Sequence, residues 1–207
     1  MKVVPVAGIL MAGCSAAEQR AEVFVVPAPD RARRAFDASA AEVWAEIVSW
    51  EGESGIRINW EEKGERGYQE TRYLKTFFAG NGQGSTILRA AWSPVGPCLA
   101  YQRASSGGHQ PYWSPITVVN TANPETEEVD LDKMVQLLHP EPEWMAVTAD
   151  SGEFFWSADG KLHFFALIGE DGKHTQFTYD PNSQEIVDLG SNATASVAGP
   201  WLREFRK

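Results

Sequence analysis

Short apolar runs, many of them alternating with polar residues, recur along most of this chain and are separated by clusters of Gly, Pro, Asn and Asp. Runs of this length between turn-forming residues are typical of β-strands. The pattern predicts strands at 23–26, 55–60, 68–78, 85–92, 99–103, 116–120, 145–148, 153–156, 162–168, 175–179 and 185–189. We therefore expect a mainly β protein built from antiparallel sheets.

Two turns in the C-terminal third support antiparallel pairing. Asp171-Gly172 supplies the positive φ that a tight hairpin requires, and 180–183 has the composition of a second turn. With the first turn centred near Asp171, His163 and His174 would not stand directly opposite each other on paired strands. We predict surface or packing roles for both histidines.

Two segments carry the hydrophobic period of an α-helix. Residues 39–51 begin with a capping box, which is followed by apolar residues at i, i+1, i+4 and i+5. Residues 131–138 form a shorter apolar segment that ends at His139-Pro140. We predict a helix in each.

One short motif occurs twice in the chain. It reads WSPVG at 92–96 and WSADGK at 156–161. A sharp turn into the next strand favours Gly, which adopts positive φ freely, and an Asp that bonds the backbone of the turn. The Trp would cover a sheet face where sheets stack, so the motif predicts an architectural role.

The unit 152–190 resembles one blade of a TolB-type, WD-like β-propeller, whose aromatic strand ends in Trp-Ser before a Pro-Asp-Gly-Lys turn. Ala158 stands where that family usually has Pro, and Val95 replaces the Asp in the earlier unit, 87–130. The resemblance implies antiparallel propeller-like blades, as in a small or partial β-propeller with one or two short helices. Residues 59–73 are a candidate for a third, degraded blade.

The sequence does not determine the number of blades, so it is compatible with more than one architecture. Closed propellers have roughly four to eight blades of about forty or more residues, so the chain has room for about four. Two or three blades alone would leave open edges. The alternatives are a small or atypical propeller, an α+β domain with blade-like sheets, and a chain that completes its sheet against a partner.

The first residues are typical of an export signal. Lys2 precedes an apolar run, 3–11, which is too short to cross a bilayer as a helix but fits a signal peptide. The small residues before Cys14 resemble the bacterial lipobox, with Met11 where Leu is usual. The resemblance implies cleavage before Cys14 and lipidation of its thiol. A buried first strand with an ordinary cysteine is the alternative.

This interpretation divides the chain into a signal peptide (1–14), a tether (15–22) and a single mainly β domain (23–207). The lipid would anchor the domain on the periplasmic side of the envelope, at the outer membrane, since the resemblance implies no retention signal in Ser15. The remaining Cys98 then has no intrachain disulfide partner. Its apolar neighbours predict a buried, unreactive thiol.

The composition predicts a folded domain and excludes one class of partner. The chain has 207 residues, of which 43% are hydrophobic, and these include 8 Trp and 10 Phe. Such content predicts a packed core and argues against disorder. The formal net charge of −10 argues against a nucleic-acid partner, which needs a cationic surface. An acidic surface suits a basic or neutral partner, and it also serves solubility.

Residue types that carry chemistry occur without a recognisable spacing. The four histidines match no metal-binding pattern, and no cysteine pair accompanies them. The Gly-rich stretch 80–86 lacks the Lys and the following helix of a phosphate loop, so it predicts a flexible hairpin. The acidic pairs at 61–62 and 125–128 predict solvated loops. We expect no catalytic residue, no cofactor and no metal.

These features favour a non-enzymatic binding protein that acts through protein–protein interaction with an envelope partner, as a scaffold or as an inhibitor of the immunity type. One alternative is a binder of small ligands or carbohydrates, with Trp113 and Trp144 as weak candidates for stacking platforms, although core packing is the more usual role of such residues. The other alternative is a hydrolase that uses carboxylates in a β cleft.

Overall fold

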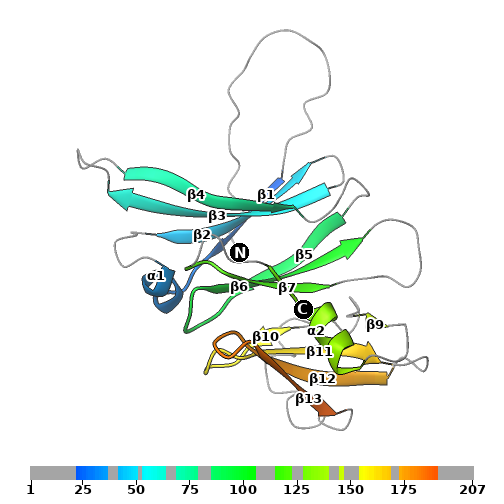
Figure 1. Cartoon of the computed structure of the whole chain (residues 1–207). Helices are drawn as coiled ribbons and strands as arrows, with labels where there is room; N and C mark the ends of the chain where they lie inside the picture. Colours follow the sequence, from blue (N-terminus) through cyan, green and yellow to red (C-terminus); the bar gives the residue numbers. More distant parts are fainter. Residues whose placement is uncertain are drawn as a thin grey trace, which may run out of the picture.

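Three antiparallel sheets follow one another along the chain and are stacked in the same order (Figure 1). Within each sheet, neighbouring strands are consecutive or nearly consecutive in sequence, so the connections are mostly short. This confirms the expectation of a mainly β, antiparallel protein. The computed structural model describes residues 22–36, 42–50, 53–63, 69–78, 85–105, 115–122, 128–139, 145–146, 154–168 and 173–190.

We name the sheets by their order in the chain. The N-terminal sheet contains β1 (Glu22–Pro27), β2 (Val43–Trp50), β3 (Glu53–Lys63) and β4 (Gln69–Phe78). The middle sheet contains β5 (Ser85–Trp92), β6 (Cys98–Ser105), β7 (Ile116–Asn120) and β8 (Val129–Asp130). The C-terminal sheet contains β9 (Met145–Ala146), β10 (Phe155–Trp156), β11 (Leu162–Ile168), β12 (Lys173–Asp180) and β13 (Glu185–Gly190). The two helices are α1 (Asp30–Phe36) and α2 (Leu131–Leu138).

The middle sheet is buried on both faces because a hydrophobic core lies on each side of it. Along β6, Leu99 and Tyr101 belong to the core shared with the N-terminal sheet, whereas Cys98 and Ala100 belong to the core shared with the C-terminal sheet. A strand covered on both faces reads as a continuous apolar run rather than an alternating one. The predicted burial of Cys98 is confirmed, and burial raises the pKa of its thiol to about 11.

The tryptophans of the repeated Trp-Ser motif join the middle sheet to the N-terminal sheet and the C-terminal sheet to the middle sheet. The indole N–H of Trp92, at the end of β5, donates to the carbonyl of Val26 in β1 at 2.9 Å. The indole N–H of Trp156, at the end of β10, donates to the carbonyl of Ala91 in β5, also at 2.9 Å. The first strands β1, β5 and β10 therefore lie side by side, with β5 in contact with both of the others. The architectural role predicted for the motif is confirmed.

The turn after each tryptophan has its own internal bonds. Ser93 N–H donates to the carbonyl of Cys98 at 2.8 Å, and Ser157 N–H donates to that of Lys161 at 2.9 Å. These bonds turn the first strand of a sheet sharply into the second. Gly160 supports the turn of the C-terminal sheet with a φ of +85°, a conformation that favours glycine.

The prediction of a helix over 39–51 is wrong. Residues 43–50 form β2 rather than part of a helix over 39–51. Val43, Ala45 and Ile47 are buried while the residues between them are half-buried, which is the period of a strand. Apolar residues on both faces of the strand happen to match the period of a helix. The segment forms a strand because it pairs with β1 and β3. The hairpin predicted at 80–86 lies outside the described residues except for Ser85 and Thr86, which begin β5.

The second predicted helix is confirmed as α2, Leu131–Leu138. The Asp130 side chain caps its first turn by accepting hydrogen bonds from the backbone N–H groups of Asp132 and Lys133. The two predicted turns are also supported. Strands β11 and β12 pair as a hairpin across 169–172, and Asp180 accepts a bond from the N–H of Asn182 at 2.9 Å.

Each predicted blade unit falls within a single sheet, although its bounds differ from those of the strands. The unit 87–130 matches the middle sheet, and the unit 152–190 matches the C-terminal sheet except for β9. The degraded unit 59–73 lies within the N-terminal sheet, which is larger than predicted. His163 stands opposite Thr178 and His174 stands opposite Leu167, so the two histidines do not face each other, as predicted.

Candidate functional site

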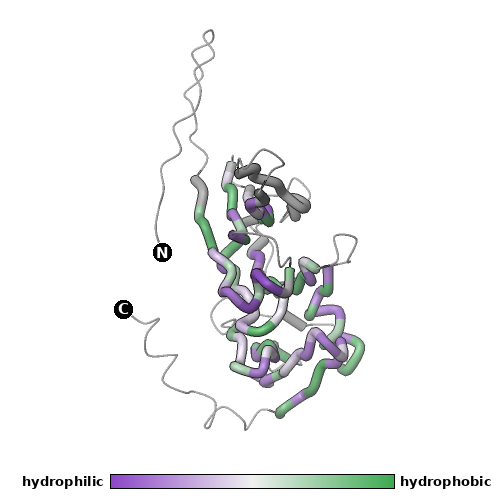
Figure 2. Tube along the Cα trace, turned by 90° about the vertical axis from the view of Figure 1, so that its left-hand side faces the viewer, coloured by the Kyte–Doolittle hydropathy of each residue, from purple (hydrophilic) through white to green (hydrophobic). Residues whose placement is uncertain are grey.

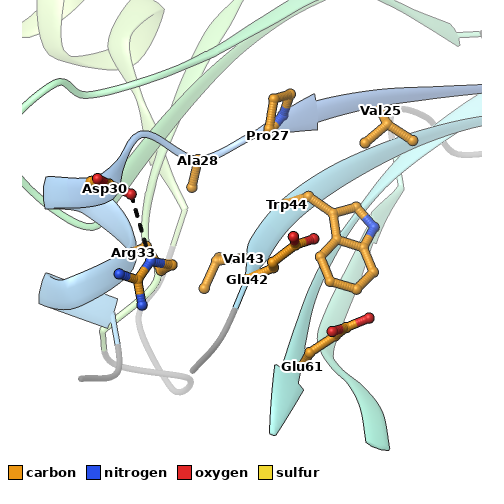
Figure 3. A pocket seen from close by; sticks show the side chains of 9 residues that line it. All are labelled: Val25, Pro27, Ala28, Asp30, Arg33, Glu42, Val43, Trp44 and Glu61. Atoms are coloured by element: carbon orange, nitrogen blue, oxygen red, sulfur yellow. Dashed lines mark ion pairs between the residues drawn. The ribbon is translucent and has the colours of Figure 1, made fainter. Parts of the chain in front are cut away.

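A pocket of about 440 Å³ opens at one end of the N-terminal sheet, where β1 leads into α1 and β2 begins (Figure 3). Backbone hydrogen bonds hold its frame. Ala28 N–H donates to the carbonyl of Val43 at 2.9 Å, which ties the segment after β1 to the start of β2. The lining residues are Val25, Pro27, Ala28, Asp30, Arg33, Glu42, Val43, Trp44 and Glu61.

Two glutamates enter the pocket from neighbouring strands. Glu61 N–H donates to the carbonyl of Glu42 at 3.0 Å, next to the register pair of Val43 and Trp60. The pairing of β2 with β3 therefore brings together two carboxylates that are far apart in the sequence. Figure 3 shows both carboxylates on the side of the pocket where the Trp44 indole lies.

The remaining charged groups come from α1. Arg33 Nε lies 3.9 Å from Asp30 Oδ1, one helical turn earlier, and the Asp30 side chain is 83% exposed. An ion pair at this distance with one partner in water is weak. With Glu42 and Glu61, the lining holds three carboxylates and one guanidinium. The pocket is therefore anionic at neutral pH.

Trp44 is the aromatic wall of the pocket, and a hydrogen-bonded pair fixes its ring. The indole N–H donates to Glu46 Oε1 at 3.1 Å, and Arg57 donates to Glu46 Oε2 at 2.6 and 3.2 Å. Burial alone would raise the pKa of the Glu46 carboxyl. The bonds from Arg57 and Trp44 outweigh that effect and hold this pKa below its usual value. The carboxylate thus stays ionised and keeps the indole in place near neutral pH.

This arrangement suits a cation. Glu42 and Glu61 supply opposite charge, and the face of the Trp44 ring attracts a cation through its quadrupole. A lysine or arginine side chain has the length to place its charge beside the carboxylates while its methylene stem packs on the indole. Such a ligand would be bound by charge and by apolar contact together.

The sequence predictions located little of this pocket. Glu61 lies in β3 and lines the pocket, so the prediction of a solvated loop at 61–62 is wrong. Glu42 and Trp44 both lie within the wrongly predicted helix over 39–51, which gives neither of them a role in a site. The signal that could have found them is the antiparallel pairing of 43–50 with 53–60, which follow each other closely in the sequence.

Other predicted site residues lie outside the described part of the chain. These are the lipidation candidate Cys14 and the stacking candidates Trp113 and Trp144. Within the described residues, no group of three or more His, Cys, Asp or Glu side chains could hold a metal ion. No helix among those residues is long and apolar enough to cross a bilayer.

A scan of the chain against protein-family models finds no match, and a search of curated proteins finds none either.

Proposed function

We propose that this chain is an exported, lipid-anchored binding protein of the bacterial envelope, and that its pocket receives a basic segment of a protein partner. The supporting observation is the pairing of Glu42 and Glu61 beside the fixed indole of Trp44. A partner lysine or arginine would satisfy these three groups together. The net charge of −10 would also attract a basic partner over longer distances.

We further infer that the three sheets are blades of a partial β-propeller. This is supported by their sequential antiparallel order and by the indole bonds of Trp92 and Trp156 at equivalent places. Stacked blades present their rims and outer faces to partners. The pocket lies at the rim of the N-terminal sheet, where a partner could reach it.

Binding of a basic probe tests the pocket. Tetralysine should bind the full chain, and Glu61→Gln should weaken that binding roughly tenfold because one of two facing carboxylates loses its charge. Affinity should also fall as salt rises, because partly exposed charges are screened. Titration calorimetry at two salt concentrations measures both effects.

The matched control for this test is Glu185→Gln. Glu185 is exposed at the start of β13, in the C-terminal sheet, and its substitution changes the net charge by the same amount. We expect this variant to bind tetralysine as the unmodified chain does. Equal weakening by both substitutions would mean that the peptide responds only to total charge, and the pocket assignment would be withdrawn.

The anchor has a separate test in cells. Cys14→Ser should abolish incorporation of a labelled fatty acid and move the protein from the membrane fraction to the soluble periplasmic fraction, because lipid attachment needs the thiol. Fractionation and labelling of a bacterial host that expresses the full chain measure both results. Cys98→Ser is the control and should leave labelling unchanged. Labelling that survives Cys14→Ser contradicts the anchor.

A further inference from the structure

The pocket presents the face of the Trp44 indole to a ligand, because the polar edge of the ring is engaged within the sheet. The indole N–H donates to Glu46 Oε1 at 3.1 Å, and Arg57 holds the same carboxylate at Oε2. Trp44 also lines the pocket. A ligand in the pocket therefore meets the π surface of this ring, which attracts cations.

Glu42, Trp44 and Glu61 lie together on the outer face of the N-terminal sheet. The alternate residues Val43 and Ala45 belong to the core shared with the middle sheet. Because successive side chains of a strand point to opposite faces, Glu42 and Trp44 point away from that core. Figure 2 shows such alternation of hydrophobic and hydrophilic residues along much of the described chain. The bond from Glu61 N–H to the carbonyl of Glu42, 3.0 Å long, sets the two carboxylates side by side on neighbouring strands.

The chemistry of these three side chains favours a guanidinium over an ammonium group. A guanidinium is planar and carries five N–H donors in a fixed fork, so it can stack on an aromatic ring while it bonds carboxylates at its edge. A lysine ammonium is a compact and strongly hydrated charge, which must lose more water to reach the ring face. Two adjacent carboxylates beside an indole face therefore fit arginine better than lysine.

The sheet itself contains one guanidinium that is bound in a similar way. Arg57 donates to Glu46 Oε2 through Nε at 3.2 Å and through Nη2 at 2.6 Å. The two residues are opposite each other in the register, on the same face as Trp44 and two residues further along β2. The Glu46 side chain is only 18% exposed, so this pair forms with water largely excluded. An arginine in the pocket would repeat the arrangement on the other side of Trp44, with Glu42 and Glu61 as acceptors.

We propose that the basic residue that this pocket receives is an arginine, whose guanidinium stacks on Trp44 and bonds the carboxylates of Glu42 and Glu61. This proposal rests on the proposed function, because it names the side chain through which the partner is held. Arg33 carries a like charge and lines the α1 side of the pocket, where Asp30 partly offsets that charge (Figure 3). The ligand guanidinium is therefore expected on the strand side, at the indole.

Two peptides of equal charge test this proposal. Tetraarginine and tetralysine carry the same number of side-chain charges, so attraction by the net charge of the protein cancels in the ratio of their dissociation constants. We expect the full chain to bind tetraarginine about fivefold more tightly in titration calorimetry, because the ring face adds to the binding of a guanidinium. Equal affinities would overturn the arginine assignment and leave the proposed function standing. If neither peptide bound, both would be overturned.

Removal of the ring shows whether the preference for arginine comes from the pocket. Trp44→Leu should lower the affinity for tetraarginine to that for tetralysine. Phe155→Leu is the matched control, because Phe155 is a half-buried aromatic residue of the C-terminal sheet, and it should leave the ratio of the two affinities unchanged. A preference that survives Trp44→Leu would belong to the peptide and not to the pocket, and the proposal would be withdrawn.

A spectroscopic measurement on the unmodified chain does not depend on how Trp44→Leu folds. In the full chain labelled with ¹⁵N, the Trp44 indole signal is assigned by its loss in Trp44→Phe. Addition of tetraarginine should shift this signal and leave the Trp156 signal in place, because Trp156 packs in the core between the middle and C-terminal sheets. A Trp44 signal that stays unmoved while tetraarginine binds would overturn the proposal.

Discussion

Trp156→Ala is expected to lower the free energy of unfolding by about 3 kcal/mol, near the lower end of the range for large aromatic truncations because the ring is only partly buried. The ring packs against the core between the middle and C-terminal sheets. Its indole N–H also holds the carbonyl of Ala91. Urea denaturation followed by far-ultraviolet circular dichroism measures the change without relying on tryptophan fluorescence.

Trp156→Phe separates the hydrogen bond from the packing. Phenylalanine keeps most of the ring contact but cannot donate to Ala91, so we expect a loss of about 1 kcal/mol. Trp92→Phe removes the equivalent bond to Val26 and should cost a similar amount. If Trp156→Phe were neutral, the bond to Ala91 would contribute nothing and Trp156 would act through packing alone; the same result for Trp92→Phe would extend this to the bond with Val26.

Strands that the sequence predicted well had two independent signals. In β11, apolar residues alternate in burial, and a hairpin turn joins it to β12. The bounds of β5 also matched, because its apolar run ends at the Trp-Ser motif. In both strands the local pattern and the tertiary partner favour the same conformation, which is the consistency expected of an unfrustrated sequence.

The segment 43–50 shows where a local pattern is insufficient. Buried Val43, Ala45 and Ile47 alternate with Trp44, Glu46 and Val48, so apolar residues occur on both faces and match a helical period by coincidence. Only the pairing of this segment with β1 and β3 determines its conformation, and the hydrophobic pattern within 43–50 does not contain that information.

The wrong prediction of a helix over 39–51 also prevented the sequence from predicting the pocket. Glu42 and Glu61 meet only because β2 and β3 pair in a defined register. A helix over 39–51 separates them, and Glu61 then reads as one more solvated charge. The contribution of α1 was also missed, since Asp30 and Arg33 follow two prolines and were assigned to no element. The residues of this pocket come together through the register of paired strands. They can therefore be predicted only when the strands themselves have been predicted correctly.

The hydrogen bonds beside the pocket leave its own charges available to a ligand. Trp44, Glu46 and Arg57 bond one another, so their charges and donors are largely satisfied within the sheet. The carboxylates of Glu42 and Glu61 line the pocket itself. A polar surface of this kind suits a partner that binds reversibly.

Gly160→Ala is expected to destabilise the protein by about 2 kcal/mol, for two separable reasons. Its φ of +85° is a conformation that alanine adopts only at a cost of about 1 kcal/mol. An alanine Cβ would also lie 2.3 Å from Val95 Cγ2, in the turn of the neighbouring sheet. Because this side chain is short and branched, the clash should force the two turns apart and add about another 1 kcal/mol.

A double-mutant cycle with Val95→Ala tests that division. Val95 is only half-buried, so Val95→Ala alone should cost little. It removes the clashing methyl groups, and the double variant should recover about half of the loss caused by Gly160→Ala. The remaining loss belongs to the backbone of the turn. Strictly additive effects would mean that the turns of the middle and C-terminal sheets do not press on each other, and that the Trp156 bond and the shared core alone hold these sheets together.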